Sequence, residues 1–476
     1  MRKHVHAVAV IAAAGAMSLA GTAQAQAISP TPRGHARTPL RIELQHVTVP
    51  AGIEMAPAHA KIVGGVPPYT AQQPVCNPPV PNGVWSRETG SEGQTLTGGG
   101  VWESPPGNFT CTVTASDSAG NTASAEKNVP AVLLSPTAVV GVGSGTTQWV
   151  LDQFSVSFNA AKPASPLYGW DATNPVTGQA GDPIVTKNGC NPVARPDGSS
   201  AGITALTTEN ATTGGQPCMD YARSSRPRTS TDPASVSFLN LARDAVTYAT
   251  QAKTNAPPNL TTADLTAIYN CAVTNWDQVG GKNAPIDAFI PQPASGVRAS
   301  FLSAVGLAGP GPCVSDDNGN LAENEGVNPV LNDPNAIVPF SVGAWLSQKF
   351  RDAKCVATGC AFVDGVACIP QPASNLFGCA EDGSLVLHEV NSTAPTAPFP
   401  PTKSSVTSPA FTATFQYLLY DVVQAPEGTQ PTGPLEALFG PAGWACTNST
   451  ARSALLHYGF EVLPTGTAAG DCGFAS

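Results

Sequence analysis

The chain has 476 residues, enough for two or three domains, and a formal net charge of −10 from 33 acidic and 23 basic residues. So acidic a protein lacks the basic face that a nucleic-acid partner requires. A small anion remains a candidate ligand, because local N–H groups rather than net charge hold such an ion.

The N-terminal residues predict a cleaved export signal over 1–25. Arg2 and Lys3 precede an apolar run at 8–20, and Ala23-Gln24-Ala25 fits a signal-peptidase site. No cysteine follows the run to carry a lipid anchor, and no later stretch is apolar enough to span a membrane. We therefore expect a secreted or periplasmic protein, with a flexible Pro- and Thr-rich leader over 26–40.

Twelve cysteines follow the signal, and an even number in an exported protein indicates disulfides. Cys76 with Cys111, and Cys446 with Cys472, are the candidate pairs that we single out. Four further cysteines are clustered without the two-residue spacing of a zinc knuckle: Cys355, Cys360, Cys368 and Cys379. We expect no metal and no cofactor.

Residues 41–130 consist of short strands and turns, which predicts a small β-sandwich. Phe109, Cys111, Val113 and Ala115 alternate with threonines, as in a half-buried strand. Together with Tyr69, this stretch resembles a bacterial immunoglobulin-like domain. The resemblance implies that Cys76 and Cys111 join its two sheets.

From residue 138 the pattern changes to strands that alternate with helices, which predicts an α/β fold with mainly parallel sheets. Thr261 and Asp264 form a near capping box at a helix start. We predict a helix followed by a strand over 236–250, and a disulfide-tied excursion over 341–409. The other predicted elements are strands at 138–142, 286–290 and 336–340, helices from 147, 298, 435 and 449, and ordered segments at 411–423 and 460–463.

Four short segments combine small hydroxyl residues with glycine or arginine, and three of them run into a predicted helix start. A helix start offers N–H groups without partners and the positive end of a dipole, and is therefore a natural anion site. Arginine adds a fork of donors that matches a tetrahedral oxyanion. The four segments are 141–147, 196–202, 223–227 and 293–298.

These segments, with the stretches 242–246 and 259–281, resemble the phosphate-binding proteins of ABC transporters. The resemblance implies a two-lobed fold of the periplasmic-binding-protein type II over 138–476, with inorganic phosphate in the interlobe cleft. One lobe would span about 138–247 and 342–476, and the other about 248–341. It also implies a monomer that is not an enzyme and delivers its solute to an ABC-transporter permease.

By the same resemblance, the ligand-binding positions are Gly145, Thr146, Thr147, Ser199, Ser225, Ser295, Gly296, Val297 and Arg298. The family often has an aspartate at the position of Ser225, and charged residues where this chain has Pro291, Gln292 and Pro293. Discrimination between phosphate and sulfate is therefore open, and Arg298 or Arg226 are candidates to balance the charge.

The sequence also fits two other functions. The β-sandwich and the Pro/Thr-rich linkers suit a secreted surface or adhesive protein with a vestigial cleft. Gly198-Ser199-Ser200-Ala201-Gly202 also fits the nucleophile elbow of a serine hydrolase, with Ser200 as the nucleophile and His388 or His457 as the later histidine.

Overall fold

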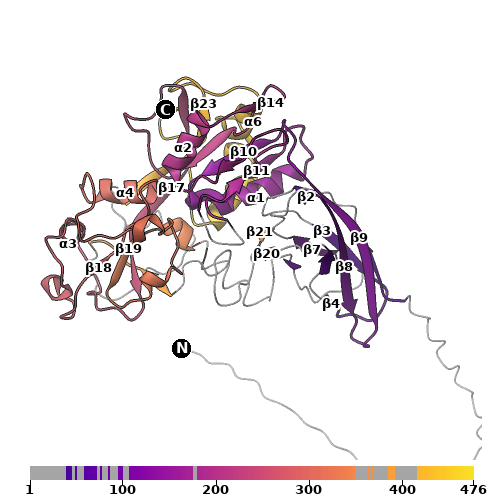
Figure 1. Cartoon of the computed structure of the whole chain (residues 1–476), viewed down its shortest axis with the longest axis horizontal. Coiled ribbons are helices and arrows are strands. Elements are labelled where there is room, and N and C mark those ends of the chain that lie inside the picture. The colour runs from indigo at the N-terminus through magenta and orange to yellow at the C-terminus, as the bar shows by residue number, and fades with distance from the viewer. Residues whose placement is uncertain are drawn as a thin grey trace, which may run out of the picture. The chain divides into compact units, whose positions relative to one another are not determined.

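The structure is a computed structural model that describes residues 39–44, 49–50, 58–71, 75–77, 84–85, 95–99, 107–174, 180–346, 348, 362–363, 366–367, 384–391 and 415–476 (Figure 1). The predicted signal peptide and almost all of the predicted leader lie outside the described residues. The same holds for the four clustered cysteines and for most of the predicted excursion.

Two small sheets form the N-terminal part of the described chain. One has the order β1 (Arg41–Leu44), β3 (Ala58–Val63), β7 (Thr95–Gly99), β6 (Val84–Trp85). The other has the order β2 (Val49–Pro50), β9 (Thr122–Val132), β8 (Gly107–Ser116), β4 (Thr70–Ala71), with β5 (Val75–Asn77) also paired to β8. The predicted alternation along β8 is confirmed, since Phe109, Cys111, Val113 and Ala115 are buried. The assignment to an immunoglobulin-like family stays a prediction.

Cys76 and Cys111 form a disulfide, as predicted. The expectation that this bond joins two sheets is wrong, because the two cysteines face each other in β5 and β8, neighbouring strands of one sheet. Contact between the two sheets comes instead from apolar side chains, with Ile62 of β3 packed in one cluster with Val113 and Ala115 of β8.

The C-terminal part is built on one mixed sheet that contains nine strands among the described residues. Its order is β11 (Leu167–Gly169), β10 (Val139–Gly143), β16 (Tyr221–Ser224), β23 (Gln416–Gln424), β17 (Val236–Gln251), β19 (Ala336–Ser341), β18 (Asp287–Ala288), and β22 (Leu385–Leu387) and β24 (Glu461–Val462) also pair with β17. The prediction of mainly parallel pairing is wrong. Parallel pairs join β10 to β11 and β16, and β18 to β19, whereas β17 and β23 run antiparallel to all their neighbours.

The long strand β17 replaces the helix and strand predicted over 236–250. Phe238, Leu241 and Ala245 have helical spacing, yet nearly every side chain of β17 is buried, on both faces of the sheet. A strand covered on both faces has a continuous apolar sequence, and such a run cannot be told from a helix by its periodicity.

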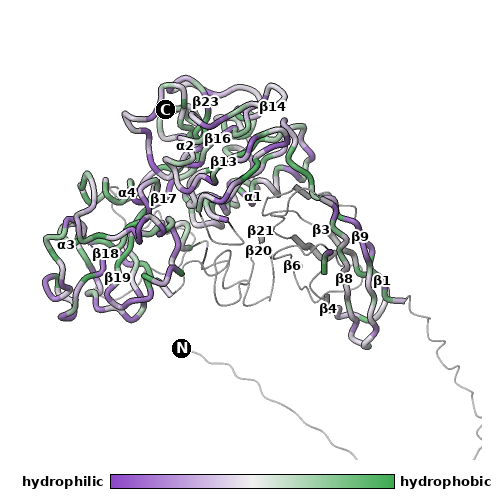
Figure 2. The backbone as a smooth tube through the Cα atoms, in the orientation of Figure 1, coloured by the Kyte–Doolittle hydropathy of each residue, from purple (hydrophilic) through white to green (hydrophobic). Residues whose placement is uncertain are grey.

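The sheet divides into two lobes along β17. In the first lobe, α1 (Gln148–Asn159), α6 (Pro434–Phe439), α7 (Trp444–Thr447) and α8 (Ser449–His457) share a core, and α2 (Ser199–Thr208) belongs to a second core. Phe154 and Leu455 lie in the first core, and Ile203 and Leu206 in the second. Figure 2 colours the backbone by the hydropathy of each residue. Three two-stranded sheets also lie among the described residues: β12 (Pro183–Ile184) with β13 (Val193–Ala194), β14 (Thr212–Thr213) with β15 (Gln216–Pro217), and β20 (Phe362–Val363) with β21 (Val366–Ala367).

The second lobe packs α3 (Thr262–Tyr269) and α4 (Gly296–Ala304) into a core with the C-terminal half of β17, β18 and β19. The predicted capping box is confirmed, because the Asp264 N–H donates to Thr261 Oγ1 at 3.1 Å and the Thr261 N–H donates to Asp264 Oδ2 at 2.9 Å. Strand β22 pairs with residues 249–251 of β17, in this lobe. Val342, Trp345, Leu346, Val390 and Phe415 also pack in the core of this lobe, whereas the expected division places all of 342–476 in the first lobe.

The change of lobe along β17 coincides with a buried carboxylate. Residues 236–245 of β17 pair with β23, and 246–250 pair with β19. Asp244, next to this change, accepts hydrogen bonds from the Ala245 N–H at 2.7 Å, the Gly343 N–H at 2.9 Å and the Tyr417 hydroxyl at 2.7 Å. It therefore ties three chain segments together where the lobes meet.

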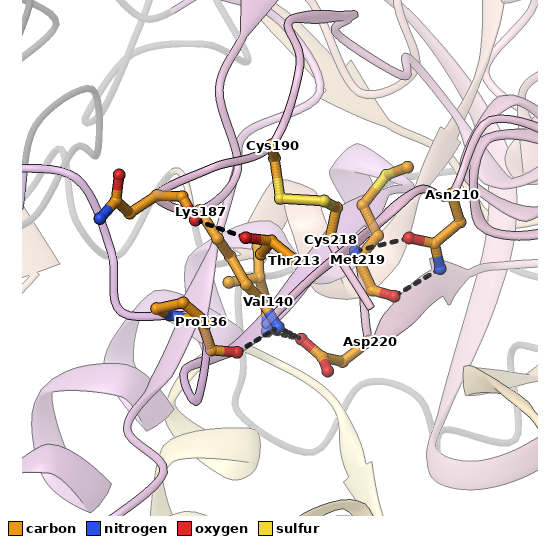
Figure 3. Close-up of a disulfide and its surroundings, with 10 residues drawn as sticks. Pro136, Val140, Lys187, Cys190, Asn210, Thr213, Cys218, Met219 and Asp220 are labelled. Carbon is orange, nitrogen blue, oxygen red and sulfur yellow. Dashed lines mark hydrogen bonds and ion pairs between the residues drawn. A yellow bond between two sulfur atoms is a disulfide. The ribbon is translucent and has the colours of Figure 1, made fainter. Parts of the chain in front are cut away.

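Disulfides also join Cys190 to Cys218, Cys271 to Cys313 and, as predicted, Cys446 to Cys472. Near the first of these, Lys187 and Asp220 form a buried ion pair at 2.6 Å, and Lys187 also donates to Pro136 O at 3.3 Å (Figure 3). Burial lowers the pKa of Lys187 and raises that of Asp220, and the attraction between them opposes both shifts. Within the described part of the chain, no helix combines the length and apolarity needed to cross a membrane.

We predict that Asp421→Asn increases stability more at about pH 7.5 than at about pH 5. Burial raises the pKa of Asp421 to about 8, and neighbouring Arg223 only partly opposes the shift. Above the unfolded pKa of about 3.9 the folded protein keeps a proton that the unfolded chain releases, so native stability falls as the pH rises toward 8. Urea unfolding at both pH values measures the difference, and an equal gain at the two values would contradict the prediction.

Candidate anion-binding site

The four predicted segments meet at one edge of the first-lobe sheet and at the start of α4. Strands β10 and β16 are parallel, so their carboxyl ends lie together, followed by Ser144 and Ser225. A bridge between Gly143 and Asp197 brings the start of α2 to the same edge. Segments up to about 150 positions apart in the chain therefore lie together.

Three serines of the first lobe form a connected, buried group. Ser144 Oγ lies 3.0 Å from Ser225 Oγ, and Ser225 Oγ lies 3.3 Å from Ser199 Oγ. The Ser225 N–H donates to Ser199 Oγ at 2.9 Å, and all three residues are fully buried. Hydroxyl groups can donate or accept, so this group adapts to the protonation state of whatever it contacts.

The second lobe contributes the first turn of α4. Ser295 caps the helix by accepting from the Arg298 N–H at 3.1 Å. Two hydrogen bonds join this turn to the first lobe: the Ser200 N–H donates to Ala294 O at 3.0 Å, and Ser300 Oγ donates to Ser225 O at 2.9 Å. The two lobes are therefore in direct contact at the site.

The side chain of Glu323, from the second lobe, lies at the centre of these donors. Its Oε1 accepts from Ser144 Oγ and from the N–H and hydroxyl of Thr146, both at 3.3 Å. Its Oε2 accepts from Ser295 Oγ at 2.7 Å, the Gly296 N–H at 3.0 Å and the Val297 N–H at 3.4 Å. One carboxylate thus receives six hydrogen bonds from five residues of both lobes.

Arg223 supports the site by holding backbone carbonyl groups. Among the described residues, it makes no hydrogen bond to the Glu323 carboxylate. Its guanidinium donates to Ser144 O at 2.9 Å, Gly143 O at 3.3 Å and Trp170 O at 2.7 Å. These bonds fix the turn after β10, so the N–H and hydroxyl groups of that turn point toward Glu323.

The other arginines in and next to the four segments are held by other partners. Arg298 donates to Pro291 O at 2.9 Å and Asp316 Oδ2 at 3.1 Å. Arg226 forms a two-pronged pair with Asp232, both contacts at 2.8 Å, and Arg228 donates to Val236 O at 2.8 Å. The expected charge balance by Arg298 or Arg226 is therefore absent from the described geometry, because carboxylates and carbonyls already engage both guanidinium groups.

Of the predicted ligand-binding positions, the structure brings Thr146, Ser295, Gly296 and Val297 onto the Glu323 carboxylate, and Ser199 and Ser225 into the adjoining hydroxyl group. Gly145 lies beside Glu323, since a Cβ there would be 3.7 Å from Glu323 Cγ. The Thr147 hydroxyl is buried without a hydrogen-bond partner among the described residues. Sequence reasoning did not single out Ser144 or Glu323 as contacting residues.

Two more buried carboxyl groups belong to this region: Asp197 interacts with the charges of Glu323 and Glu325. Burial, reinforced by the charge of Glu323, raises the pKa of Asp197 to about 7, and burial raises that of Glu325 to about 7. Asp197 Oδ1 has no hydrogen-bond partner among the described residues. The described part of the chain contains no cluster of metal-ligating side chains.

The structure does not assemble a nucleophile at Ser200 from the described side chains. Ser200 Oγ accepts from the Arg226 guanidinium at 3.0 Å. His388 lies instead in the second lobe, where it stacks on Tyr248 and contacts Thr250 Oγ1 at 2.7 Å. Burial lowers the pKa of His388 to about 4. The side chain of His457 lies outside the described residues.

The chain belongs to the PBP superfamily, because the model of a PBP superfamily domain matches residues 134–377, just over half of its length. No curated protein matches it.

Similar solved structures include an ABC-type phosphate transport receptor from Vibrio cholerae. The two sequences are 16% identical, the match covers 68% of this chain and 100% of the receptor, and the TM-score is 0.41. A putative phosphate ABC transporter substrate-binding protein with bound phosphate, from Clostridium perfringens, is 16% identical. The match covers 69% of this chain and 100% of that protein, with a TM-score of 0.42. PstS from Borrelia burgdorferi has 18% identity, 69% and 99% coverage, and a TM-score of 0.33.

We predict that Gly296→Ala separates α4 from the first lobe. A Cβ at this position would lie 2.3 Å from both Ser199 Oγ and Ser225 Oγ, closer than atoms can approach. The clash should cost about 1–3 kcal/mol of unfolding free energy in a urea titration. Gly309→Ala is the matched control, since its Cβ would meet nothing within 4 Å. Equal stabilities of the two variants would show that the lobes do not approach each other in this way.

Proposed function

We propose that this PBP superfamily protein binds a small oxyanion, with inorganic phosphate preferred, in the pocket between its lobes. The observation that carries the proposal is the convergence of six hydrogen-bond donors on one carboxylate. Groups that surround a carboxylate in this way can surround the oxygen atoms of another anion. The donors belong to both lobes, so a solute bound there would hold the lobes together.

Phosphate is preferred over sulfate because the pocket is bordered by acceptors as well as donors. Hydrogen phosphate carries a proton that a buried acceptor can take in a hydrogen bond, and sulfate carries none. The hydroxyls of Ser199 and Ser225, which adjoin the donors, can act as such acceptors. The family often has an aspartate at the position of Ser225, and in this proposal the hydroxyl acceptors take the role of that aspartate.

The remaining parts of the proposal concern location and partner. Four disulfides join described residues, which fits a protein that folds in an oxidising compartment outside the cytoplasm. We propose that the protein is exported, acts as a monomer without catalytic activity, and delivers its solute to an ABC-transporter permease.

A second candidate function is a surface or adhesive role in which the cleft takes no solute. One specific observation favours it: Glu323 itself already satisfies the donors of the pocket. Titration of the native protein separates the two candidates, since the adhesive role predicts no heat with phosphate, sulfate or arsenate.

We predict that Thr146→Val weakens phosphate binding by about 1.5–3 kcal/mol, the contribution of a hydrogen bond to a charged group. The change keeps the shape of the side chain and removes the hydroxyl that faces the pocket. Isothermal titration calorimetry with phosphate, sulfate and arsenate gives the affinities. Thr208→Val, on the exposed side of α2, is the matched control and should leave them unchanged. Equal affinities for native protein and Thr146→Val would remove the Thr146 hydroxyl from the proposed set of phosphate donors.

A further inference from the structure

Glu323 has the contacts of a bound anion although it is part of the chain. Its side chain is buried, and both carboxylate oxygens accept several hydrogen bonds. Oε2 faces the helix start of its own lobe, whereas Oε1 reaches across to Ser144 and Thr146 of the other lobe. The carboxylate therefore links the two lobes in the way that a solute in the cleft would.

Hydrogen bonds hold the segment that carries Glu323 on both sides of this residue. They fix the backbone from which its side chain extends. Leu321 O accepts from the Gln292 N–H at 2.8 Å. Asn324 has a positive φ of 62° and donates to Thr146 Oγ1 at 3.0 Å, while its Oδ1 accepts from the Ser341 N–H at 3.0 Å. Asn324 is thus a positioning residue for Glu323.

The charge of Glu323 is balanced by neutral donors alone. No ion pair within the described ranges includes Glu323, and Arg223, which holds the turn of Ser144, donates to backbone carbonyls. A second anion could not share these donors, because two negative charges in one buried space without a cation repel each other strongly.

We propose that Glu323 is an internal ligand of the pocket, which a free oxyanion must displace before it binds. This inference rests on the proposed function and concerns the regulation of the same site. A tethered group acts at a high effective concentration, so it lowers the apparent affinity of a free competitor by the fraction of time that it leaves the pocket. The native protein would then respond only to high solute concentrations.

Two substitutions remove the internal ligand in different ways. Glu323→Ala deletes the carboxylate. Glu323→Gln keeps the volume, but one end of an amide must turn its N–H₂ group toward fixed N–H donors, either Thr146 on one side or Gly296 and Val297 on the other. Asp277→Asn, at an exposed position of the second lobe, is the control for the lost charge.

The first measurement is phosphate affinity by isothermal titration calorimetry. We expect both Glu323 variants to bind phosphate at least about tenfold more tightly than the native protein, and Asp277→Asn to match the native protein. If native protein binds phosphate and the Glu323 variants bind it equally or more weakly, the internal-ligand inference is overturned while the proposed function stands.

The second measurement does not depend on phosphate. The atoms that Glu323→Ala removes beyond Cβ correspond to those of acetate, so acetate should fill the space and raise the thermal midpoint of this variant. Acetamide, the neutral analogue, should not, and neither the native protein nor Glu323→Gln should respond to acetate. If neither the native protein nor any variant binds phosphate, the proposed function fails. A rise in the thermal midpoint of Glu323→Ala with acetate alone would then still support the internal-ligand inference, and the absence of this rise would overturn that inference.

Discussion

A buried carboxylate without a cation is the constraint on which the pocket depends. Such a charge is costly unless hydrogen bonds replace those of water, and here turns and helix starts supply them. Ser144 and Thr146 can serve only because Arg223 holds the carbonyls of their turn, and Gly296 only because it has no Cβ. Strand ends, helix caps and one buried guanidinium therefore serve a single electrostatic requirement.

Local sequence patterns predict several parts of this structure correctly. The capping box at Thr261, the alternation along β8 and two disulfide pairs are short-range or compositional signals, and all are confirmed. The four hydroxyl-rich segments are also local patterns, and the structure gathers them around one space. Glu323 carries no such signal, since its partners lie between 26 and 179 positions away in the chain.

The wrong predictions have a common physical origin. Each depends on contacts with a distant part of the chain, which the local sequence does not contain. The apolar run of β17 suits a helix face equally well until its second covered face is known. Arg298 suggests an anion because a cation is unfavourable at a helix start, yet Asp316, 18 positions further along the chain, already offsets that charge. In each case the deciding partner belongs to another element.

The passage of β17 through both lobes determines how a cleft in this protein can open. The strand is continuous, so relative rotation of the lobes would twist its backbone near residues 245–246, where its pairing partner changes. Asp244 grips the N–H groups of Ala245 and Gly343 on either side of that point. Opening of the cleft would therefore act on the hydrogen bonds of this one carboxylate, and the crossing at β17 is a braced joint rather than a flexible linker.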